Sequence, residues 1–301
     1  MRVLVTGGSG DVGVFVVDRL KNKHDVTIVD LRPPRSFPDV AYIQVDLTDG
    51  EQVRKAIKGY DAVVHLAAIP NPFKDPGERV LNVNMASTYN VLEALRENGV
   101  PRVVYSSSES VSGFGLHHVD FKPLYFPIDE RHPCWPHESY SLSKYFSELM
   151  CREYSRAYGV ESIALRYACV WLDVIAEDIE EFIHGDLEKT NSKNWFGAYI
   201  FPEDVAQAVD LALDYDLPDP EMPFEEFYLT AEDSSTRQDS VPYVSRLFPQ
   251  GTPPIRKPEY YAENPQATLF DITKAREELG FRPEYTWRDW GGPRRVKPGA
   301  R

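Results

Sequence analysis

The chain has 301 residues and a formal net charge of −14 at pH 7. Hydrophobic residues make up 42% of it and charged residues 27%, which is ordinary for a globular protein and excludes a disordered or collagen-like chain. The acidity argues against nucleic acid or anionic lipid as a partner, because both are bound by clustered Lys and Arg. Any anionic ligand must therefore be held by local features.

No apolar stretch approaches the about 18–20 residues that a membrane-spanning helix needs, so we expect no membrane contact. The three cysteines, Cys134, Cys151 and Cys169, are an odd number at wide spacing. This favours reduced thiols over a disulfide framework. We therefore expect a cytoplasmic protein.

Short β-branched runs alternate with amphipathic helical stretches through the first 170 residues, as in βαβ units around a parallel sheet. The runs are largely apolar, as expected for strands that are covered on both faces. The expected strands are 3–6, 26–30, 41–45, 62–66, 102–106 and 162–166, and the expected long helices are 80–97 and 139–158. Between the last two strands, residues 110–137 predict a long ordered loop.

The regular alternation fades after Arg166, although 202–215 still indicates a helix and 227–230 a strand. We therefore expect a sheet domain followed by a smaller lobe that covers the substrate. The predicted sheet domain comprises residues 1–169 and also 196–231, where the chain returns to it. The predicted lobe comprises 170–195 and 232–290. Residues 291–301 are expected to be a loose tail.

The first predicted strand runs directly into a glycine-rich turn and then into an apolar helix at 14–20. Glycine suits such a turn because the backbone must reach positive φ, approach a pyrophosphate closely and let the helix pack on the strand. Backbone N–H groups and the helix dipole then attract the phosphates. The residues predicted to bind the dinucleotide here are Gly7, Gly10, Asp11, Val12 and Gly13. A structural turn without a ligand is the alternative, and the strand before and helix after the turn argue against it.

The second predicted strand ends at Asp30, where a carboxylate accepts hydrogen bonds from the adenosine ribose and repels a 2′-phosphate. This favours NAD over NADP, although the nearby Arg32 and Arg35 keep NADP open, and a solvated strand-end aspartate is the alternative. Asp46 and the following Leu47, after the third strand, are predicted to meet the adenine edge.

A candidate catalytic pair opens the predicted helix 139–158. Tyr140 and Lys144 are four residues apart and share a helix face, so we expect the ammonium to lower the pKa of the phenol from about 10 and make it a general base. The fifth strand ends in Ser106-Ser107-Ser108, and a hydroxyl at this strand end is expected to orient the substrate oxygen. A Tyr–Lys pair at this spacing is often only a surface pair, and its position after the glycine turn and Asp30 favours catalysis.

Together these features resemble the extended short-chain dehydrogenase/reductase family, also called NAD-dependent epimerases and dehydratases. The likeness covers residues 1 to about 215, and its stretches are TGGSGDVG at 6–13, VVHLAA at 63–68, NVNMASTYNVLEAL at 82–95, VVYSSSESVSG at 103–113, ESYSLSKYFSE at 138–148 and LRYACVW at 165–171. The resemblance implies an α/β fold, with a doubly wound parallel Rossmann sheet and a small C-terminal substrate-binding lobe.

The resemblance also implies roles for individual residues. Ser108 takes the place of the catalytic hydroxyl residue, Tyr140 that of the proton-transferring base, and Lys144 that of the residue that binds the nicotinamide ribose. The resemblance further implies that Asn84 braces the site and that Leu66, Ala67 and Ala68 line the cofactor. Members of the family pair their two long helices into a homodimer, here 80–97 and 139–158.

Departures from the family pattern bear on the substrate. Dehydratases carry Asp-Glu after the hydroxyl residue, whereas this chain has Glu109 and Ser110, so dehydration is disfavoured. The arginine that meets a nucleotide diphosphate is missing from 197–201, Cys169 replaces an Asn, and Ser112 replaces a Tyr. A free sugar, sugar acid or similar polyol is therefore favoured over a nucleotide sugar, with Glu109 and Cys169 as candidate substrate contacts.

Histidines at 117, 118, 132 and 137, with Cys134, suggest a metal site in the long loop, but their spacing does not form the tight pairs of zinc sites, so no metal is expected.

The leading hypothesis is NAD-dependent oxidation of a secondary hydroxyl. A nucleotide-sugar 4-epimerase with transient oxidation, and a non-catalytic NAD sensor, are the alternatives.

Overall fold

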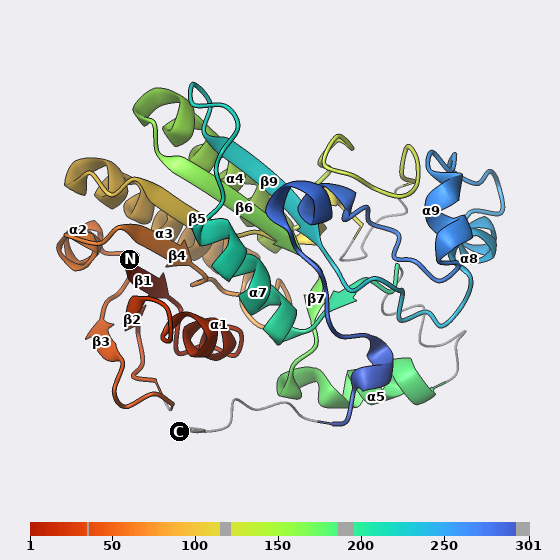
Figure 1. The fold of residues 1–301 in the computed structure, drawn as a ribbon, viewed down its shortest axis with the longest axis horizontal. Helices are drawn as coiled ribbons and strands as arrows, with labels where there is room; N and C mark the ends of the chain where they lie inside the picture. Colours follow the sequence, from red (N-terminus) through yellow and green to blue (C-terminus); the bar gives the residue numbers. More distant parts are fainter. Residues whose placement is uncertain (35, 115–121, 186–195, 293–301) are drawn as a thin grey trace.

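The computed structural model describes residues 1–34, 36–114, 122–185 and 196–292 (Figure 1). A seven-stranded sheet of order β3-β2-β1-β4-β5-β6-β9 forms its centre, and every neighbouring pair of strands is parallel. The chain winds from β1 to one edge and then crosses back to β4 to build the other half. The expected doubly wound α/β Rossmann sheet is confirmed.

The predicted strands and helices are present with small shifts at their ends. For example, the helix expected at 80–97 spans Gly77–Asn98, and the strand expected at 227–230 spans Phe224–Leu229. The elements are β1 (Arg2–Thr6), α1 (Gly13–Leu20), β2 (Asp25–Asp30), β3 (Ala41–Gln44), α2 (Gly50–Ile57), β4 (Ala62–His65), α3 (Gly77–Asn98), β5 (Arg102–Ser106), α4 (Ser139–Tyr158), β6 (Glu161–Tyr167), β7 (Cys169–Val170), α5 (Ala176–His184), β8 (Tyr199–Ile200), α7 (Pro202–Leu213), β9 (Phe224–Leu229), α8 (Ser240–Leu247) and α9 (Pro258–Glu263).

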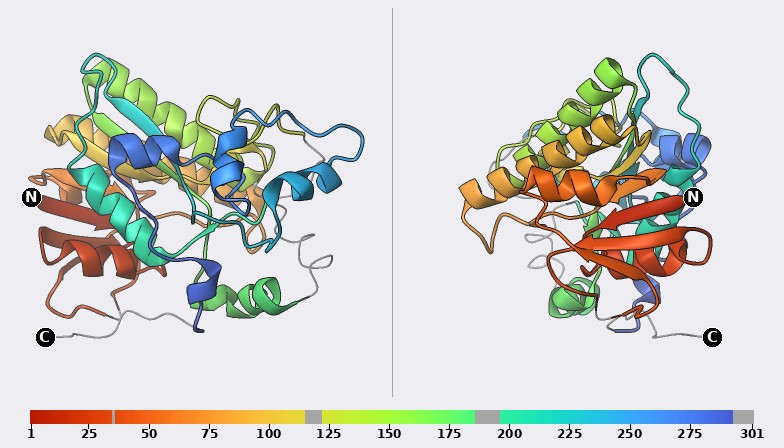
Figure 2. Two further views of the ribbon diagram at one scale, coloured as in Figure 1. Left: turned by 45° about the vertical axis from the view of Figure 1, so that its right-hand side comes forward. Right: turned by 90° about the vertical axis from the view of Figure 1, so that its left-hand side faces the viewer.

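Helices cover both faces of the sheet because alternate strand residues are apolar on both sides. Val3 and Val5 of β1 pack in one cluster with residues of α1 and α7, whereas Leu4 between them packs with residues of α2, α3 and α4. Figure 2 shows these two helical layers on opposite sides of the sheet. All three β1 side chains are fully buried, as the near-continuous apolar runs predict.

Helices α3 and α4 lie side by side and are joined by buried hydrogen bonds. Asn84 Nδ2 donates to Ser143 Oγ at 3.0 Å, and Ser147 Oγ donates to Thr88 Oγ1 at 3.2 Å. The Glu138 side chain caps the start of α4 by accepting backbone N–H bonds from Tyr140 and Ser141. This cap fixes where α4 begins and therefore where its first side chains lie.

The remaining elements lie beyond the carboxyl ends of the central strands, where Figure 1 shows α8 and α9 on one side and α5 on another. Phe126, Phe196, Tyr228 and Phe270 belong to an aromatic-rich core in this region. The segment Ala275–Leu279 instead packs in the cluster that contains α1 and α7. Strand β9 pairs with β6, although α5, β8 and α7 separate the two in the sequence. In the part of the chain that the structure describes, no helix has the length and hydropathy to cross a membrane.

Candidate active site

The glycine turn after β1 is packed too closely for side chains. Gly7 has φ +71°, and a Cβ on it would lie 2.7 Å from the backbone nitrogen of Ala67. A Cβ on Gly13 would lie 2.1 Å from the Gly7 carbonyl oxygen. No described side chain caps the start of α1, and Gly10 and Asp11 are exposed at the turn. The turn therefore offers backbone N–H groups and a helix N-terminus to a pyrophosphate, which is what a dinucleotide requires.

Asp30 lies beside this turn, as the sequence predicts. Its carboxylate accepts hydrogen bonds from the backbone N–H groups of Ser9 at 3.2 Å and Arg32 at 3.3 Å. These bonds hold the carboxylate at the end of β2 and leave lone pairs for ribose hydroxyls. The contacts fit the role in NAD binding that we assign to Asp30.

Asp46 and Leu47 follow β3 at the same edge of the sheet. Asp46 is exposed, and its carboxylate accepts bonds from Thr48 N at 2.9 Å and Thr48 Oγ1 at 2.7 Å, which form the turn into α2. Leu47 is buried in the core beside α2 and α3. The contact of these two residues with adenine stays a prediction.

Residues after β4 approach the glycine turn from the neighbouring strand. Leu66, Ala67 and Ala68 are partly buried there. Asn84 of α3 holds the backbone that follows them, because it accepts from Ile69 N at 2.8 Å and donates to Ile69 O at 3.1 Å. Since the Asn84 amide also donates to Ser143, it links the backbone after β4 to α4.

The structure brings the three predicted catalytic residues together. Tyr140 is 9% and Lys144 3% exposed, and Lys144 Nζ lies 5.6 Å from the centroid of the Tyr140 ring. Lys144 Nζ also donates to the carbonyl oxygen of Ser106 at 2.7 Å. Ser108 forms a side-chain hydrogen bond with Tyr140 and accepts one from Ser110 N at 3.2 Å. A phenol, an ammonium and a hydroxyl thus meet where β5 ends.

The expected downward shift of the Tyr140 pKa is not found. Burial raises the pKa of Tyr140 well above 10, nearby Tyr167 and Glu109 raise it further, and the hydrogen bond with Ser108 lowers it only in part. Burial also lowers the pKa of Lys144 to about 7. The predicted lowering of the Tyr140 pKa is therefore wrong, because desolvation of the buried phenol is the largest contribution and Lys144 is not among the largest ones.

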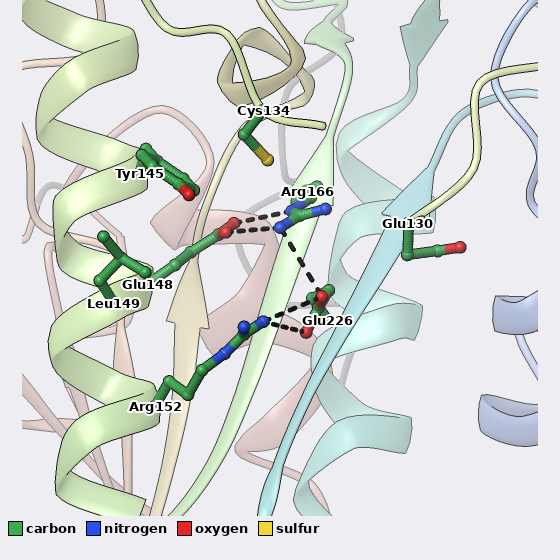
Figure 3. Close-up of a pocket in the computed structure, with 8 residues that line it drawn as sticks. All are labelled: Glu130, Cys134, Tyr145, Glu148, Leu149, Arg152, Arg166 and Glu226. Carbon is green, nitrogen blue, oxygen red and sulfur yellow. Dashed lines mark hydrogen bonds and ion pairs between the residues drawn. The ribbon is translucent and has the colours of Figure 1, made fainter. Parts of the chain in front are cut away.

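A buried ion pair one turn beyond Lys144 fixes α4 to the sheet (Figure 3). Glu148 accepts from Arg166 Nε at 2.9 Å and Nη2 at 2.7 Å, and both side chains are 3% exposed. Ser107 Oγ donates to Glu148 at 2.5 Å. We did not predict this pair, although Tyr140, Lys144 and Glu148 recur at every fourth position on one helix face, a signal that could have identified Glu148.

A cavity of about 170 Å³ lies against this ion pair. Arg152 and Glu226 form a second, more exposed pair in its wall (Figure 3). The lining residues are Glu130, Cys134, Tyr145, Glu148, Leu149, Arg152, Arg166 and Glu226. None of them belongs to the glycine turn or to the Ser108, Tyr140 and Lys144 trio, but Glu148 accepts a hydrogen bond from Ser107, the neighbour of Ser108.

Two further polar residues near the catalytic trio were missed in the sequence. The Tyr167 side chain, at the end of β6, hydrogen-bonds to the Ser106 side chain. His65, at the end of β4, lies between Thr6 Oγ1 at 2.7 Å and Thr88 Oγ1 at 3.2 Å, and burial lowers its pKa to about 3, which keeps it neutral. Their position at strand ends was the available signal.

The candidate substrate contacts lie beside the trio. Glu109 is 8% exposed and lies close enough to Tyr140 and Cys169 for its charge to raise the pKa of both. Cys169 is exposed at the start of β7. The two residues are therefore placed to meet a substrate held at Tyr140, and their contact with it stays a prediction.

In the long loop, His132 has a structural role. His132 is buried, and its Nε2 accepts from Leu124 N at 3.0 Å. Positions 117 and 118 lie outside the described residues. Within the described ranges, no group of three or more His, Cys, Asp or Glu residues is placed to hold a metal ion.

A parallel sheet with a glycine turn after β1 and a Ser–Tyr–Lys trio after β5 defines a dinucleotide-dependent enzyme on a Rossmann fold. The chain matches the model of the NAD dependent epimerase/dehydratase family over residues 3–222 and belongs to that family. It is thus an NAD-dependent enzyme of the dehydrogenase and epimerase type, and its cofactor is NAD.

Curated relatives include both kinds of enzyme. The chain is 31% identical to L-arabinose 1-dehydrogenase (NAD(P)(+)) of Haloferax volcanii, over 72% of this chain and 84% of the relative. It is 29% identical to the uronate dehydrogenase of Pseudomonas putida, over 62% of this chain and 71% of the relative. It is 28% identical to the UDP-glucose 4-epimerase of Streptococcus mutans, over 95% of this chain and 92% of the relative.

Solved structures share the fold. A short-chain dehydrogenase/reductase superfamily protein from Agrobacterium tumefaciens with bound NAD superposes with a TM-score of 0.69 at 23% identity, over 96% of this chain and 94% of that one. UDP-glucose 4-epimerase of Thermotoga maritima gives a TM-score of 0.68 at 23% identity, over 95% of this chain and 94% of that one. At these identities the likeness concerns the fold.

Gly13→Ala is expected to damage the dinucleotide site, because the new Cβ would lie 2.1 Å from the Gly7 carbonyl oxygen. Overpacking of this kind costs about 1–3 kcal/mol. We expect NAD affinity, measured by calorimetry, to fall by at least about tenfold. Gly291→Ala is the control, since nothing lies within 4 Å of its Cβ position. Equal NAD affinity in the two variants would contradict the assignment.

Arg166→Met is expected to lower the free energy of unfolding by about 3–5 kcal/mol, because it leaves the Glu148 carboxylate buried without its partner. Urea denaturation monitored by circular dichroism measures this. Arg152→Met is the matched control, as the Arg152 side chain is 42% exposed and its pair with Glu226 is worth about 1 kcal/mol or less. If both variants lost a similar free energy of unfolding, the Glu148–Arg166 pair would not stabilise the fold more than the exposed pair does.

Proposed function

We propose that this enzyme oxidises a secondary hydroxyl of a free sugar, sugar acid or similar polyol. The single observation that carries the proposal is the convergence of Ser108, Tyr140 and Lys144 at the end of β5, next to the turn that fits a dinucleotide. We further propose that residues 170–195 and 232–290 form a lobe that covers the substrate.

Each member of the trio has one task in this chemistry. Ser108 Oγ would hold the substrate oxygen, and Tyr140 Oη would accept the hydroxyl proton as a phenolate, whose own proton has first passed to solvent. When bound, NAD supplies the hydride acceptor and a positive charge at this edge of the sheet. With NAD bound, the hydride of the broken carbon–hydrogen bond would have an acceptor, and the substrate carbon–oxygen double bond could form. Lys144, held by the Ser106 carbonyl, binds the nicotinamide ribose.

The relatives that act on free sugars support a free substrate. The haloarchaeal relative is named for L-arabinose and the Pseudomonas relative for uronate. The absence of an arginine from 197–201 also weighs against a nucleotide diphosphate. Relatives named UDP-glucose 4-epimerase favour a second candidate, in which the keto intermediate takes the hydride back from the other face and no NADH accumulates.

Tyr140→Phe is expected to lower kcat by about 10²–10⁴-fold and leave NAD affinity unchanged, because the variant keeps the ring and loses only the proton acceptor. The measurement is NADH absorbance with free sugars, uronates and UDP-sugars, together with product analysis. NADH formed from a free sugar or uronate supports the proposal. An isomer of a UDP-sugar without NADH would select the epimerase instead, and full cellular function of Tyr140→Phe would indicate a sensor.

We also propose that the protein forms a homodimer through the outer faces of α3 and α4 and works in the cytoplasm. Large side chains are exposed on these helices: Tyr89 by 49%, Phe146 and Leu149 by 37% each, and Tyr158 by 56%. Such a face gains stability when a second copy covers it. The cytoplasmic location is supported by the free cysteines.

Light scattering after size exclusion is expected to give twice the chain mass of 34.4 kDa. Phe146→Glu is expected to shift the protein to the monomer, because it places a charge in the proposed interface. Val174→Glu, at a 62% exposed apolar residue outside α3 and α4, is the control and should remain dimeric. A monomeric wild-type protein would rule the dimer out.

A further inference from the structure

Ser107 is the middle residue of the run Ser106-Ser107-Ser108, and it has no place in the chemistry proposed above. Its side chain is fully buried, and its Oγ donates to Glu148 Oε1 at 2.5 Å. Arg166 already binds both oxygens of that carboxylate, through Nε at 2.9 Å and Nη2 at 2.7 Å. The charge of Glu148 is therefore compensated without Ser107. What the serine bond adds is a link between the end of β5 and α4.

The backbone of Ser107 fixes the direction of a neighbouring carbonyl group. The N–H of Ser107 and the C=O of Ser106 belong to one planar peptide unit and therefore turn together. At one end of this unit, Ser107 N donates to Leu165 O of β6 at 2.9 Å. At its other end, Ser106 O accepts from Lys144 Nζ at 2.7 Å. A rotation of the unit would therefore turn the acceptor away from the ammonium group of Lys144.

Two side chains of α4 reach this short segment. Lys144 and Glu148 are four residues apart, so they lie on the same face of α4. Lys144 donates to the Ser106 carbonyl, and Glu148 accepts from the Ser107 hydroxyl. Two consecutive residues at the end of β5 are thus tied to two side chains that lie one helical turn apart. This double link restrains the strand end relative to the helix.

Lys144 depends on the Ser106 carbonyl for its direction. Among the described residues, this carbonyl oxygen is the hydrogen-bond acceptor of Lys144 Nζ. The rings of Tyr105 and Tyr140 have their centroids 5.3 and 5.6 Å from Nζ, and these are contacts with a ring face and not hydrogen bonds. The proposed contact of Lys144 with the nicotinamide ribose therefore follows the orientation of the Ser106 carbonyl.

We propose that Ser107 is a positioning residue, which aims the Ser106 carbonyl at Lys144 and so places the ammonium for the nicotinamide ribose. The bond to Glu148 also restrains Ser108, the next residue in the chain. The inference rests on the proposed role of Lys144 and adds a residue that acts only through its neighbours.

Ser107→Ala removes the hydroxyl and should leave a folded protein, because Arg166 still compensates the Glu148 carboxylate. NAD affinity, measured by calorimetry, should fall about fivefold, the worth of one hydrogen bond. Ser147→Ala is the matched control, since Ser147 is also fully buried and its Oγ ties α4 to Thr88 of α3 and not to β5. It should keep NAD affinity within about twofold of the wild type. Circular dichroism checks that each variant is folded.

A double-mutant cycle separates positioning from a merely structural role. Lys144→Met should lower NAD affinity by about tenfold, because it removes the ammonium that binds the ribose. Since Ser107 acts through Lys144, adding Ser107→Ala to Lys144→Met should lower the affinity no further. The same loss from Ser107→Ala in both backgrounds would indicate a structural role and overturn the inference. An unchanged NAD affinity in Ser107→Ala would overturn it as well.

Steady-state kinetics adds a readout of the reaction. With a free sugar or uronate that the wild type oxidises, Ser107→Ala should lower kcat about tenfold and change KM for that substrate by less than about threefold, because the reacting groups are displaced and the substrate contacts remain. Ser147→Ala should keep both constants near their wild-type values. An unchanged kcat in a folded Ser107→Ala would contradict the inference.

The failure of this inference and that of the proposed function give different results. If the wild type oxidises no free sugar or uronate, the proposed function is wrong, and the cycle on NAD affinity still decides the role of Ser107. If Lys144→Met leaves NAD affinity unchanged, the roles of Lys144 and Ser107 are both wrong, whereas oxidation of a free sugar by the wild type would still support the proposed reaction.

Discussion

The buried ion pair between Glu148 and Arg166 is the interaction on which the geometry of the site depends. It joins α4 to β6, and the bond from Ser107 joins the same carboxylate to the end of β5. Tyr140 and Lys144 are carried by α4, while Ser108 follows β5. The position of Tyr140 relative to Ser108 is therefore constrained by an ion pair that includes neither residue.

The rest of the site follows from the parallel sheet. All its central strands end at one edge, so residues far apart in the sequence, such as Asp30, Ala67 and Ser108, meet there. An acidic chain attracts a dinucleotide at this edge through backbone N–H groups, because Gly7 and Gly13 keep the turn free of side chains. The net negative charge of the chain therefore does not prevent it from binding an anionic dinucleotide at the glycine turn.

The parts of the structure that follow from local pattern were predictable from the sequence. The positions of the strands, the glycine turn and the spacing of Tyr140 and Lys144 depend on short-range rules, and they agree with the structure. The pKa of Tyr140 was not predictable, because it depends on how much water the surrounding side chains exclude. Arg166 was missed for a similar reason: nothing in its own strand reveals that a helix residue will pair with it.

The pairing of β9 with β6 has a consequence for how the chain folds. The strand that carries Arg166 lies at an open edge until β9 is added, and β9 is synthesised only after α5, β8 and α7. Early in synthesis that edge has unpaired backbone groups, which favour association with other chains. The half of the sheet that carries Arg166 is therefore completed only when Phe224–Leu229 is in place.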